Sequence, residues 1–258
     1  MTESLSAKIQ LFKSLFKGRE DVFAVRWEIK EKSGYMPAYY YDPYLYRTHK
    51  MKGGSFKNYN DKSYLKLTDD EIAKHLNGEQ HIGIYSLLTD NTSWFLAADF
   101  DKENWIDQSK DFINTCSEKG IPAYLERSRS GNGGHVWIFF EHAYPAFKSR
   151  RIFISLLEQS GIISIFDKAS SFDRLFPNQD FLSGKGLGNL IALPLFKHSW
   201  EQGNNCFVDI ETMLPVSDQW EFLKNVNRTA TSELDKLYQQ SFDSTASVSI
   251  NISAETCK

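Results

Sequence analysis

The sequence predicts an α+β protein built around an antiparallel sheet, and three observations lead to that fold class. Short apolar segments with the composition of buried strands recur through the middle of the chain. Two segments with apolar residues at helical spacing are each followed closely by a glycine. A polar, glycine-rich turn joins two of the strands as a hairpin. The expected order is strands at 82–88 and 94–100, a helix at 104–119, strands at 121–126 and 135–140, and a helix at 147–159, as in a split βαβ unit.

Three features precede this core. The N-terminal segment has apolar side chains at helical spacing and is expected to form an amphipathic helix. Residues 20–66 are aromatic-rich and have the pattern of an irregular segment, with a loop at 52–54. A short helix follows at 68–75, because Thr68 is a favourable N-cap and Glu71 completes a capping box with it. The apolar side of the first helix is formed by Ile9, Leu11, Phe12, Leu15 and Phe16.

The C-terminal part adds strands at 190–196 and 206–210 and a helix at 218–226. Beyond Gln240 the chain is rich in Ser and Thr without an apolar period, which is typical of a frayed tail or of a linker to something larger. We therefore expect three parts. They are a basic, aromatic-rich extension packed on the core (1–80), the core itself (81–228), and a C-terminal helix with a Ser/Thr-rich tail or linker (229–258).

Composition excludes several classes of protein. The 258 residues are 41% hydrophobic and 24% charged, which is an ordinary globular mixture. No apolar run reaches the roughly 18 residues of a membrane span, and the N-terminus lacks the apolar stretch of a secretion signal. We therefore expect a cytoplasmic protein with no membrane partner. The three cysteines lie far apart, which argues against a zinc knuckle or a disulfide framework.

The net charge of −3 hides a basic N-terminal quarter. Residues 1–66 contain thirteen Lys and Arg but only seven Asp and Glu. Such a surface would hold a phosphate backbone while nearby tyrosines stack on bases. A solvated lysine surface over a tyrosine-rich core explains the same composition, and both interpretations stay open. The tyrosines in question are Tyr39, Tyr40, Tyr41, Tyr44 and Tyr46.

Two carboxylates end the strand at 94–100. Asp99 and Asp101 are two residues apart, so both side chains leave the same face of the strand, roughly 6–7 Å apart. Such a pair would hold two divalent cations, as phosphoryl transfer requires, and oxygen ligands favour Mg²⁺ or Mn²⁺. The alternative is an ordinary strand end before a helix N-cap, where acids are also favoured.

The hairpin turn at 126–135 carries basic and small residues beyond what a turn needs. Successive glycine amides form an anion-binding concavity, and arginines clamp phosphate oxygens. His135 follows the turn, where its ring would donate to a phosphate. The alternative is a plain hairpin with surface charge and a surface histidine. The candidate nucleotide-binding residues of the turn are Arg127, Arg129, Ser130 and Gly133.

A later group of residues would complete such a site. Asp209 ends another apolar strand and is the candidate third metal ligand, with Glu211 as its competitor. Lys185, in a glycine-rich loop, and Lys197 would both reach a triphosphate. Loop closure by the glycines and a solvated Lys197 are the plain alternatives.

The segments AADFD, SGNGGHVWIFF and FVDIE resemble the three motifs of the archaeo-eukaryotic primase superfamily. The longer strings AYLERSRSGNGGHVWIFF and DRLFPNQDFLSGKGLGNLIALPL resemble, more closely, the primase-polymerase domain of bacterial TOTE conflict systems. The likeness covers roughly residues 15–225.

This resemblance implies an RRM-like catalytic core and template-directed nucleotide addition, with primer synthesis as a further capacity. It implies that Asp99, Asp101 and Asp209 hold metal ions and that His135 contacts the phosphates of the incoming nucleotide. It also extends nucleotide binding to Lys185 and Asn189, beside the arginines of the turn. Family members of this type continue into helicase and nuclease domains, which are the partners that the resemblance implies. The sequence contains neither a GKS/T phosphate loop nor a zinc module.

The leading hypothesis is therefore a DNA primase-polymerase that uses two divalent cations, Mg²⁺ or Mn²⁺, with (d)NTPs and a single-stranded or primed DNA template. A catalytically degenerate module that binds nucleic acid or nucleotide is the alternative from another class. A metal-dependent nuclease is a third hypothesis, since paired acids also cleave phosphodiesters.

Overall fold

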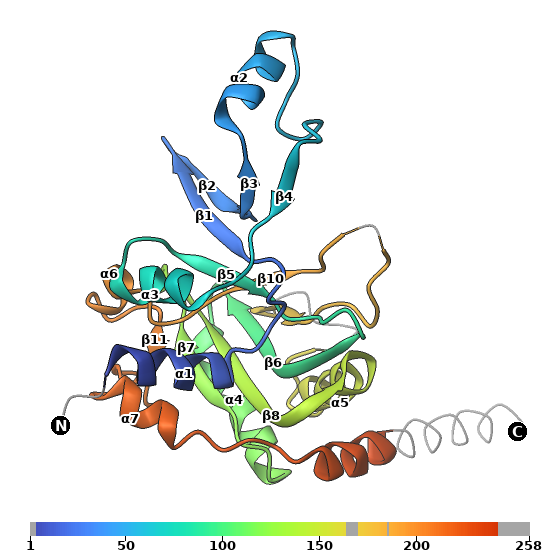
Figure 1. The fold of residues 1–258 in the computed structure, drawn as a ribbon. Helices are drawn as coiled ribbons and strands as arrows, with labels where there is room; N and C mark the ends of the chain where they lie inside the picture. Colours follow the sequence, from blue (N-terminus) through green and yellow to red (C-terminus); the bar gives the residue numbers. More distant parts are fainter. Residues whose placement is uncertain (1–3, 164–169, 185, 242–258) are drawn as a thin grey trace, which may run out of the picture.

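Two antiparallel sheets organise the chain, as Figure 1 shows. The computed structural model describes residues 4–163, 170–184 and 186–241. The larger sheet has the strand order β11-β7-β8-β6-β9 and the smaller one the order β10-β5-β1-β2. The larger sheet consists of β6 (Thr92–Asp101), β7 (Tyr124–Arg127), β8 (Gly133–Pro145), β9 (Phe172–Phe176) and β11 (Cys206–Phe207). The smaller sheet consists of β1 (Ala24–Ile29), β2 (Lys32–Pro37), β5 (Ile82–Tyr85) and β10 (Leu190–Ala192).

Helices cover both faces of the larger sheet. α4 and α5 pack on one face, where their buried residues join a core with the even-numbered side chains of β6 and β8. α1, α3 and α7 join the core on the opposite face. A further helical segment spans residues 231–241. The bounds are α1 (Leu5–Leu15), α2 (Pro43–Met51), α3 (Asp69–Asn77), α4 (Trp105–Glu118), α5 (Ala146–Gln159), α6 (Lys197–Trp200) and α7 (Gln219–Lys224).

The two cores follow from the alternation of side chains along β6. Phe95 and Ala97 point into the core with α1 and α3, whereas Leu96 and Ala98 point into the core with α4 and α5. By the same period of two, Asp99 lies on the face that looks toward α1 and the smaller sheet. The order of elements and the antiparallel pairing confirm the predicted α+β class.

The sequence signals for the start of α3 and the end of α4 are confirmed. Thr68 is the N-cap of α3, and its hydroxyl accepts a hydrogen bond from the backbone N–H of Glu71 at 3.4 Å. Gly120, just beyond α4, has a φ of +72°, a left-handed conformation that glycine adopts without strain. In α1, the side chains of Ile9, Phe12 and Leu15 are buried, as the helical spacing predicted.

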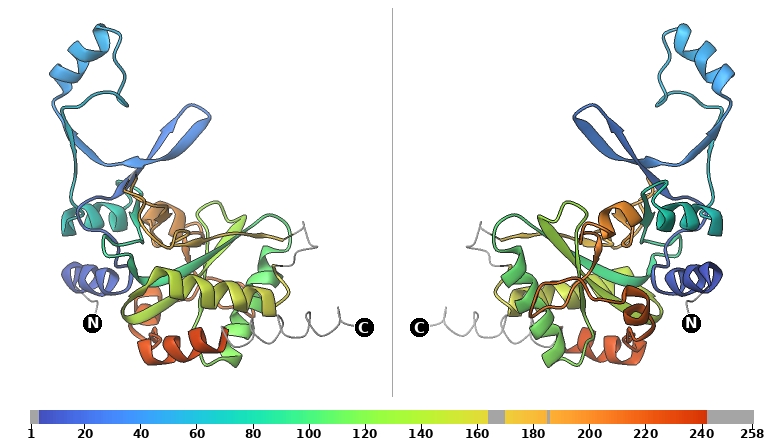
Figure 2. Two further views of the ribbon diagram at one scale, coloured as in Figure 1. Left: turned by 90° about the vertical axis from the view of Figure 1, so that its right-hand side faces the viewer. Right: turned by 90° about the vertical axis from the view of Figure 1, so that its left-hand side faces the viewer.

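The prediction that residues 20–66 are irregular is wrong. β1 and β2 form a hairpin, and β3 (Tyr39–Tyr41) pairs with β4 (Lys62–Tyr64) on either side of α2. The alternating pattern is weak because most of these side chains are only partly buried. Figures 1 and 2 show the segment with α2 projecting from the rest of the molecule.

Two predicted strands are shorter in the structure, and one strand was not predicted. The strand predicted at 190–196 ends at Ala192 and is followed by α6, and the strand predicted at 206–210 covers only β11. β9 was not predicted, because charged residues interrupt its short apolar pattern. The Ser/Thr-rich segment at 242–258 lies outside the described residues. None of the helices in the described ranges has the length and apolar character that a membrane crossing needs.

Candidate functional site

Three aspartates meet at one end of the larger sheet. Asp99 and Asp101 come from β6, and Asp173 comes from β9, the neighbouring strand. One carboxylate oxygen of each lies within 4.8 Å of the others. Three oxygen donors at this spacing are a set that Mg²⁺ or Mn²⁺ accepts.

A β-bulge brings Asp173 into this group. Asp99 is opposite Arg174, whereas Phe100 is opposite Phe172, so Asp173 has no partner in the ladder. A bulge of this kind turns a side chain away from its regular direction and is frequent beside active sites. Sequence reasoning missed Asp173 because its position depends on this pairing.

The electrostatics of the cluster favour a bound cation. Burial raises the pKa of Asp99 to about 6, and the charges of Asp101 and Asp173 act in the same direction against the opposing charge of His135. Crowded carboxylates of this kind are stabilised when a cation neutralises them. Gly133 adds to the fit, because a Cβ at that position would lie 2.3 Å from the Asp101 Oδ1 atom. A larger residue would therefore displace a donor of the cluster.

His135 lies opposite Asp99 in the β6–β8 ladder. Its Nδ1 atom donates to the Glu126 Oε2 atom at 2.6 Å, and its Nε2 atom lies 3.7 Å from the Asp99 Oδ1 atom. Burial alone would lower the pKa of His135. The negative charges of Glu126, Asp99 and Asp101 outweigh that effect and raise the pKa to about 9. His135 is therefore a cation at neutral pH, with Nε2 directed toward the carboxylates.

Glu126 is the second residue that sequence reasoning missed. Its side chain is fully buried and accepts hydrogen bonds from His135, from Trp137 Nε1 at 3.2 Å and from Asn205 Nδ2 at 2.9 Å. Buried carboxylates are stable only with such partners. The signal was its place in the hairpin, where Glu126 pairs directly with His135 across the turn.

Two of the predicted nucleotide-binding residues support the chain instead of facing the cluster. Arg127 donates to the backbone oxygens of Gly203, at 3.1 Å, and of Met213. It follows Glu126 in β7, so the alternation of the strand directs its side chain to the other face. Asn189 donates to the backbone oxygen of Leu175 at 3.2 Å and accepts from the backbone N–H of Asn178 at 3.1 Å.

The structure does not bring Asp209 to the three aspartates. It follows β11, which lies at the opposite edge of the sheet from β9, with β7 and β8 between β11 and β6. Its carboxylate accepts from the N–H and the hydroxyl of Thr212, both at 2.8 Å, in an exposed turn. These hydrogen bonds hold the pKa of Asp209 below its usual value. Lys185 lies outside the described residues.

The remaining residues of the turn border two cavities, one of which includes Asp101 of the cluster. Arg129 lines one of about 620 Å³ together with Arg26, His81 and Phe196. Asp101 and the turn residues 131–132 line another, of about 790 Å³, with the start of α4. Ser130 accepts from the backbone N–H of Asn132 at 3.3 Å, which stabilises the turn. The two cavities leave space for a ligand on both sides of the turn.

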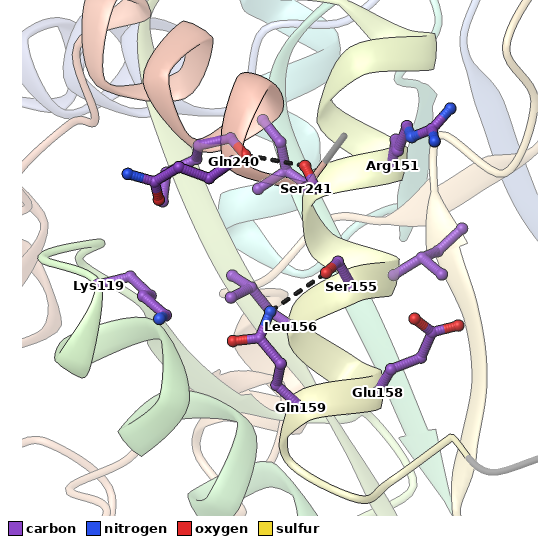
Figure 3. A pocket seen from close by; sticks show the side chains of 11 residues that line it. Lys119, Arg151, Ser155, Leu156, Glu158, Gln159, Gln240 and Ser241 are labelled. Carbon is purple, nitrogen blue, oxygen red and sulfur yellow. Dashed lines mark hydrogen bonds between the residues drawn. The ribbon is translucent and has the colours of Figure 1, made fainter. Parts of the chain in front are cut away.

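A further cavity lies away from the cluster. It has about 810 Å³ and lies between α5 and the helical segment 231–241 on the α4–α5 side of the sheet. Figure 3 shows its polar side chains, among them Gln159, which donates to the Ser155 hydroxyl at 3.2 Å. No aspartate or histidine lines it, so its size alone does not indicate the chemical site.

The chain is similar to known proteins in structure and in sequence. Among solved structures, the chain is similar to the polymerase domain of ligase D from Mycobacterium tuberculosis in complex with DNA, with 9% sequence identity and a TM-score of 0.43. That match covers 92% of this chain and 86% of the other, and no residue role is transferred from it. No curated protein matches. The model of the TOTE conflict system archaeo-eukaryotic primase domain matches residues 7–237, most of the sequence, and the chain therefore belongs to this family.

Proposed function

We propose that the chain is a DNA primase-polymerase that transfers nucleotides from (d)NTPs to a 3′-hydroxyl under the direction of a template, and that it also starts primers. The observation that carries the proposal is the cluster of Asp99, Asp101 and Asp173 with His135 beside it. Membership of a primase family supports a nucleotidyltransferase of this kind. A module that only binds nucleotides would have no need for three crowded carboxylates.

In this proposal Asp99, Asp101 and Asp173 hold Mg²⁺ or Mn²⁺, and Asp173 takes the place that the sequence assigned to Asp209. The bound ions would lower the pKa of the attacking hydroxyl and stabilise the leaving pyrophosphate. The carboxylates are set by two paired strands, so their spacing is fixed before substrate arrives.

His135 has a separate role in the proposal. Its Nδ1–H is held by Glu126, which leaves Nε2 to donate to a phosphate oxygen of the nucleotide. The Glu126 carboxylate at Nδ1 fixes the orientation of the ring, so Nε2 stays directed toward the cluster. Arg129, Ser130 and Lys185 remain proposed nucleotide-binding residues, whereas we assign Arg127 and Asn189 to support of the surrounding loops.

The test is incorporation of labelled nucleotides on single-stranded DNA, with and without a primer, in Mg²⁺ and in Mn²⁺. We expect products in both primer conditions and none from Asp99→Ala with Asp101→Ala. Asp111→Ala, an exposed acid in the middle of α4, is the matched control and keeps full incorporation. Undiminished synthesis by the double variant would refute the proposal, and shortening of the labelled primer would assign the cluster to a nuclease.

A further inference from the structure

The projecting segment between β2 and α3 has a core of its own. We call residues 39–64, which contain β3, α2 and β4, the arm. Figures 1 and 2 show it extending away from the body of the molecule beyond the β1–β2 hairpin. Inside the arm, Phe56 contacts Tyr41 and Tyr46 with ring centroids 5.2 and 5.3 Å apart. Tyr59 is 3% exposed, and the Lys62 ammonium group donates to the backbone oxygen of Phe56 at 2.7 Å. The arm is thus an ordered element.

A second set of aromatic and apolar side chains in the arm faces solvent. Tyr40 is 69% exposed, Tyr44 76% and Met51 82%. Tyr44 and Met51 are seven residues apart in α2, so they lie on one face of the helix with Arg47 between them. An ordered element that exposes several large apolar groups on one side marks an interaction surface. The structure therefore divides the tyrosines, because some build the core of the arm and others remain available.

The charge of the arm identifies the kind of partner. Arg47, Lys50, Lys52 and Lys57 are all exposed, and no acidic side chain of the described residues forms an ion pair with them. Asp42, one of the two acids of the arm, caps α2 by accepting from the N–H of Tyr44 at 2.7 Å. The whole chain has a net charge of −3, so this surplus is local. Exposed aromatic rings among unpaired cations are the composition that binds single-stranded nucleic acid.

The β1–β2 hairpin, from which the chain enters the arm, reaches the candidate site. The Glu28 carboxylate, near the tip of the hairpin, lies 4.0 Å from the guanidinium of Arg129, in the turn that precedes His135, whereas the arm continues from the other end of the hairpin, at Pro37. Arg26 of β1 lines the same cavity as Arg129. The hairpin therefore connects the arm with the turn that carries Arg129.

We propose that the arm binds single-stranded DNA, with Tyr40 and Tyr44 stacking on bases and Arg47, Lys50, Lys52 and Lys57 contacting phosphates. The choice of DNA rests on the proposed function, whereas the charge and the exposed rings of the arm do not. The arm adds affinity for the strand that the cluster of aspartates does not supply.

The test measures binding of a fluorescently labelled oligodeoxythymidylate to the full chain by anisotropy over a series of salt concentrations. Tyr40→Ala with Tyr44→Ala should weaken binding at least about tenfold, because each stacked base contributes on the order of 1–3 kcal/mol. Tyr40→Phe with Tyr44→Phe keeps both ring faces and should bind within about twofold of the wild type. Since all these side chains are exposed, the variants are expected to fold, and their circular dichroism and melting temperature verify that they do.

The phosphate-binding role of the cations is tested separately. Replacing Lys50, Lys52 and Lys57 by Gln should reduce the slope of log K against log salt by about 2, because each phosphate that is no longer neutralised reduces it by about 0.7. The matched control replaces Lys110, Lys119 and Lys236, three lysines of the body, by Gln and should leave the slope unchanged.

These results separate the arm from the active site. Asp99→Ala should lose incorporation and keep the affinity for the oligonucleotide. If both arm variants bind as the wild type does, the arm proposal is overturned while the proposed function stands. Arm-dependent binding without incorporation by the wild type would overturn the proposed function alone. Unchanged binding together with self-association that disappears in Tyr40→Ala with Tyr44→Ala would assign the arm to a second copy of the chain.

Discussion

Replacing Glu126 by Gln should destabilise the fold and disable the site. The carboxylate accepts from His135 and Trp137 at Oε2 and from Asn205 at Oε1. A glutamine amide presents an NH₂ group on one side. In one orientation that group faces the donors of His135 and Trp137, and in the other it faces Asn205 Nδ2. Asn205 cannot turn to compensate, because its Nδ2 also donates to Leu193 at 3.2 Å and its Oδ1 accepts from Phe196 at 2.9 Å.

The expected cost follows from these hydrogen bonds. One buried donor left without an acceptor costs about 1–3 kcal/mol, and loss of the charge-assisted bond to His135 costs about 1.5–3 kcal/mol. We therefore expect the free energy of unfolding to fall by about 3–5 kcal/mol, measured by urea denaturation at neutral pH. Glu141→Gln, on the exposed part of β8, is the matched control and should change it by less than about 0.5 kcal/mol.

The same variant should lose nucleotide incorporation at temperatures where it remains folded, because Glu126 holds the His135 ring with Nε2 toward Asp99. A free energy of unfolding for Glu126→Gln within about 1 kcal/mol of the wild type would mean that the three hydrogen bonds carry no net stability, contrary to this prediction.

One further prediction tests the close packing beside the cluster, and another tests the stability of the protein in acid. Gly133→Ala would place a Cβ 2.3 Å from the Asp101 Oδ1 atom and 2.6 Å from the Phe100 backbone oxygen, so β6 and β8 must shift. We expect a loss of about 1–3 kcal/mol in urea denaturation and weaker Mn²⁺ binding by titration, and unchanged Mn²⁺ affinity would show that the close approach is relieved without moving the carboxylate. His75 and His81 should make the protein unstable in acid: mainly through burial, folding lowers their pKa values from 6.5 to about 4 and about 3. The unfolded chain binds protons below about pH 6.5 and the folded chain does not, so stability is full above pH 6.5 and declines toward pH 4, by about 2 kcal/mol per histidine at pH 5. Denaturation midpoints of the wild type and of His75→Asn between pH 7.5 and 5 check this, and equal declines in both proteins would contradict the assignment.

Local patterns predicted most of the core. Asp99 and Asp101 share one strand, so a period of two was enough to place them on one face. The helix boundaries at Thr68 and Gly120 likewise depend on neighbouring residues only. The pairing of Glu126 with His135 was also within reach, because the hairpin turn sets its own register.

The third aspartate was beyond local reasoning. Asp173 and Asp209 both stand beside short apolar runs, and what separates them is which strands pair. β9 pairs with β6 and carries a bulge, whereas β11 pairs with β7 at the far edge. Pairing between segments distant in sequence leaves no periodic signal. The arm was missed for a different reason, since its strands are partly exposed and its apolar pattern is correspondingly faint.

We propose that Asp173, and not Asp209, completes the metal site. Mn²⁺ binding, followed by titration of the purified protein, tests it directly in the variants Asp173→Asn and Asp209→Asn. We expect Asp173→Asn to lose at least about tenfold in affinity, because it removes one of three charged donors. Asp209→Asn should bind Mn²⁺ as the wild type does, since its carboxylate only caps a turn with Thr212. The reverse pattern, with Asp209→Asn impaired and Asp173→Asn unaffected, would contradict the account.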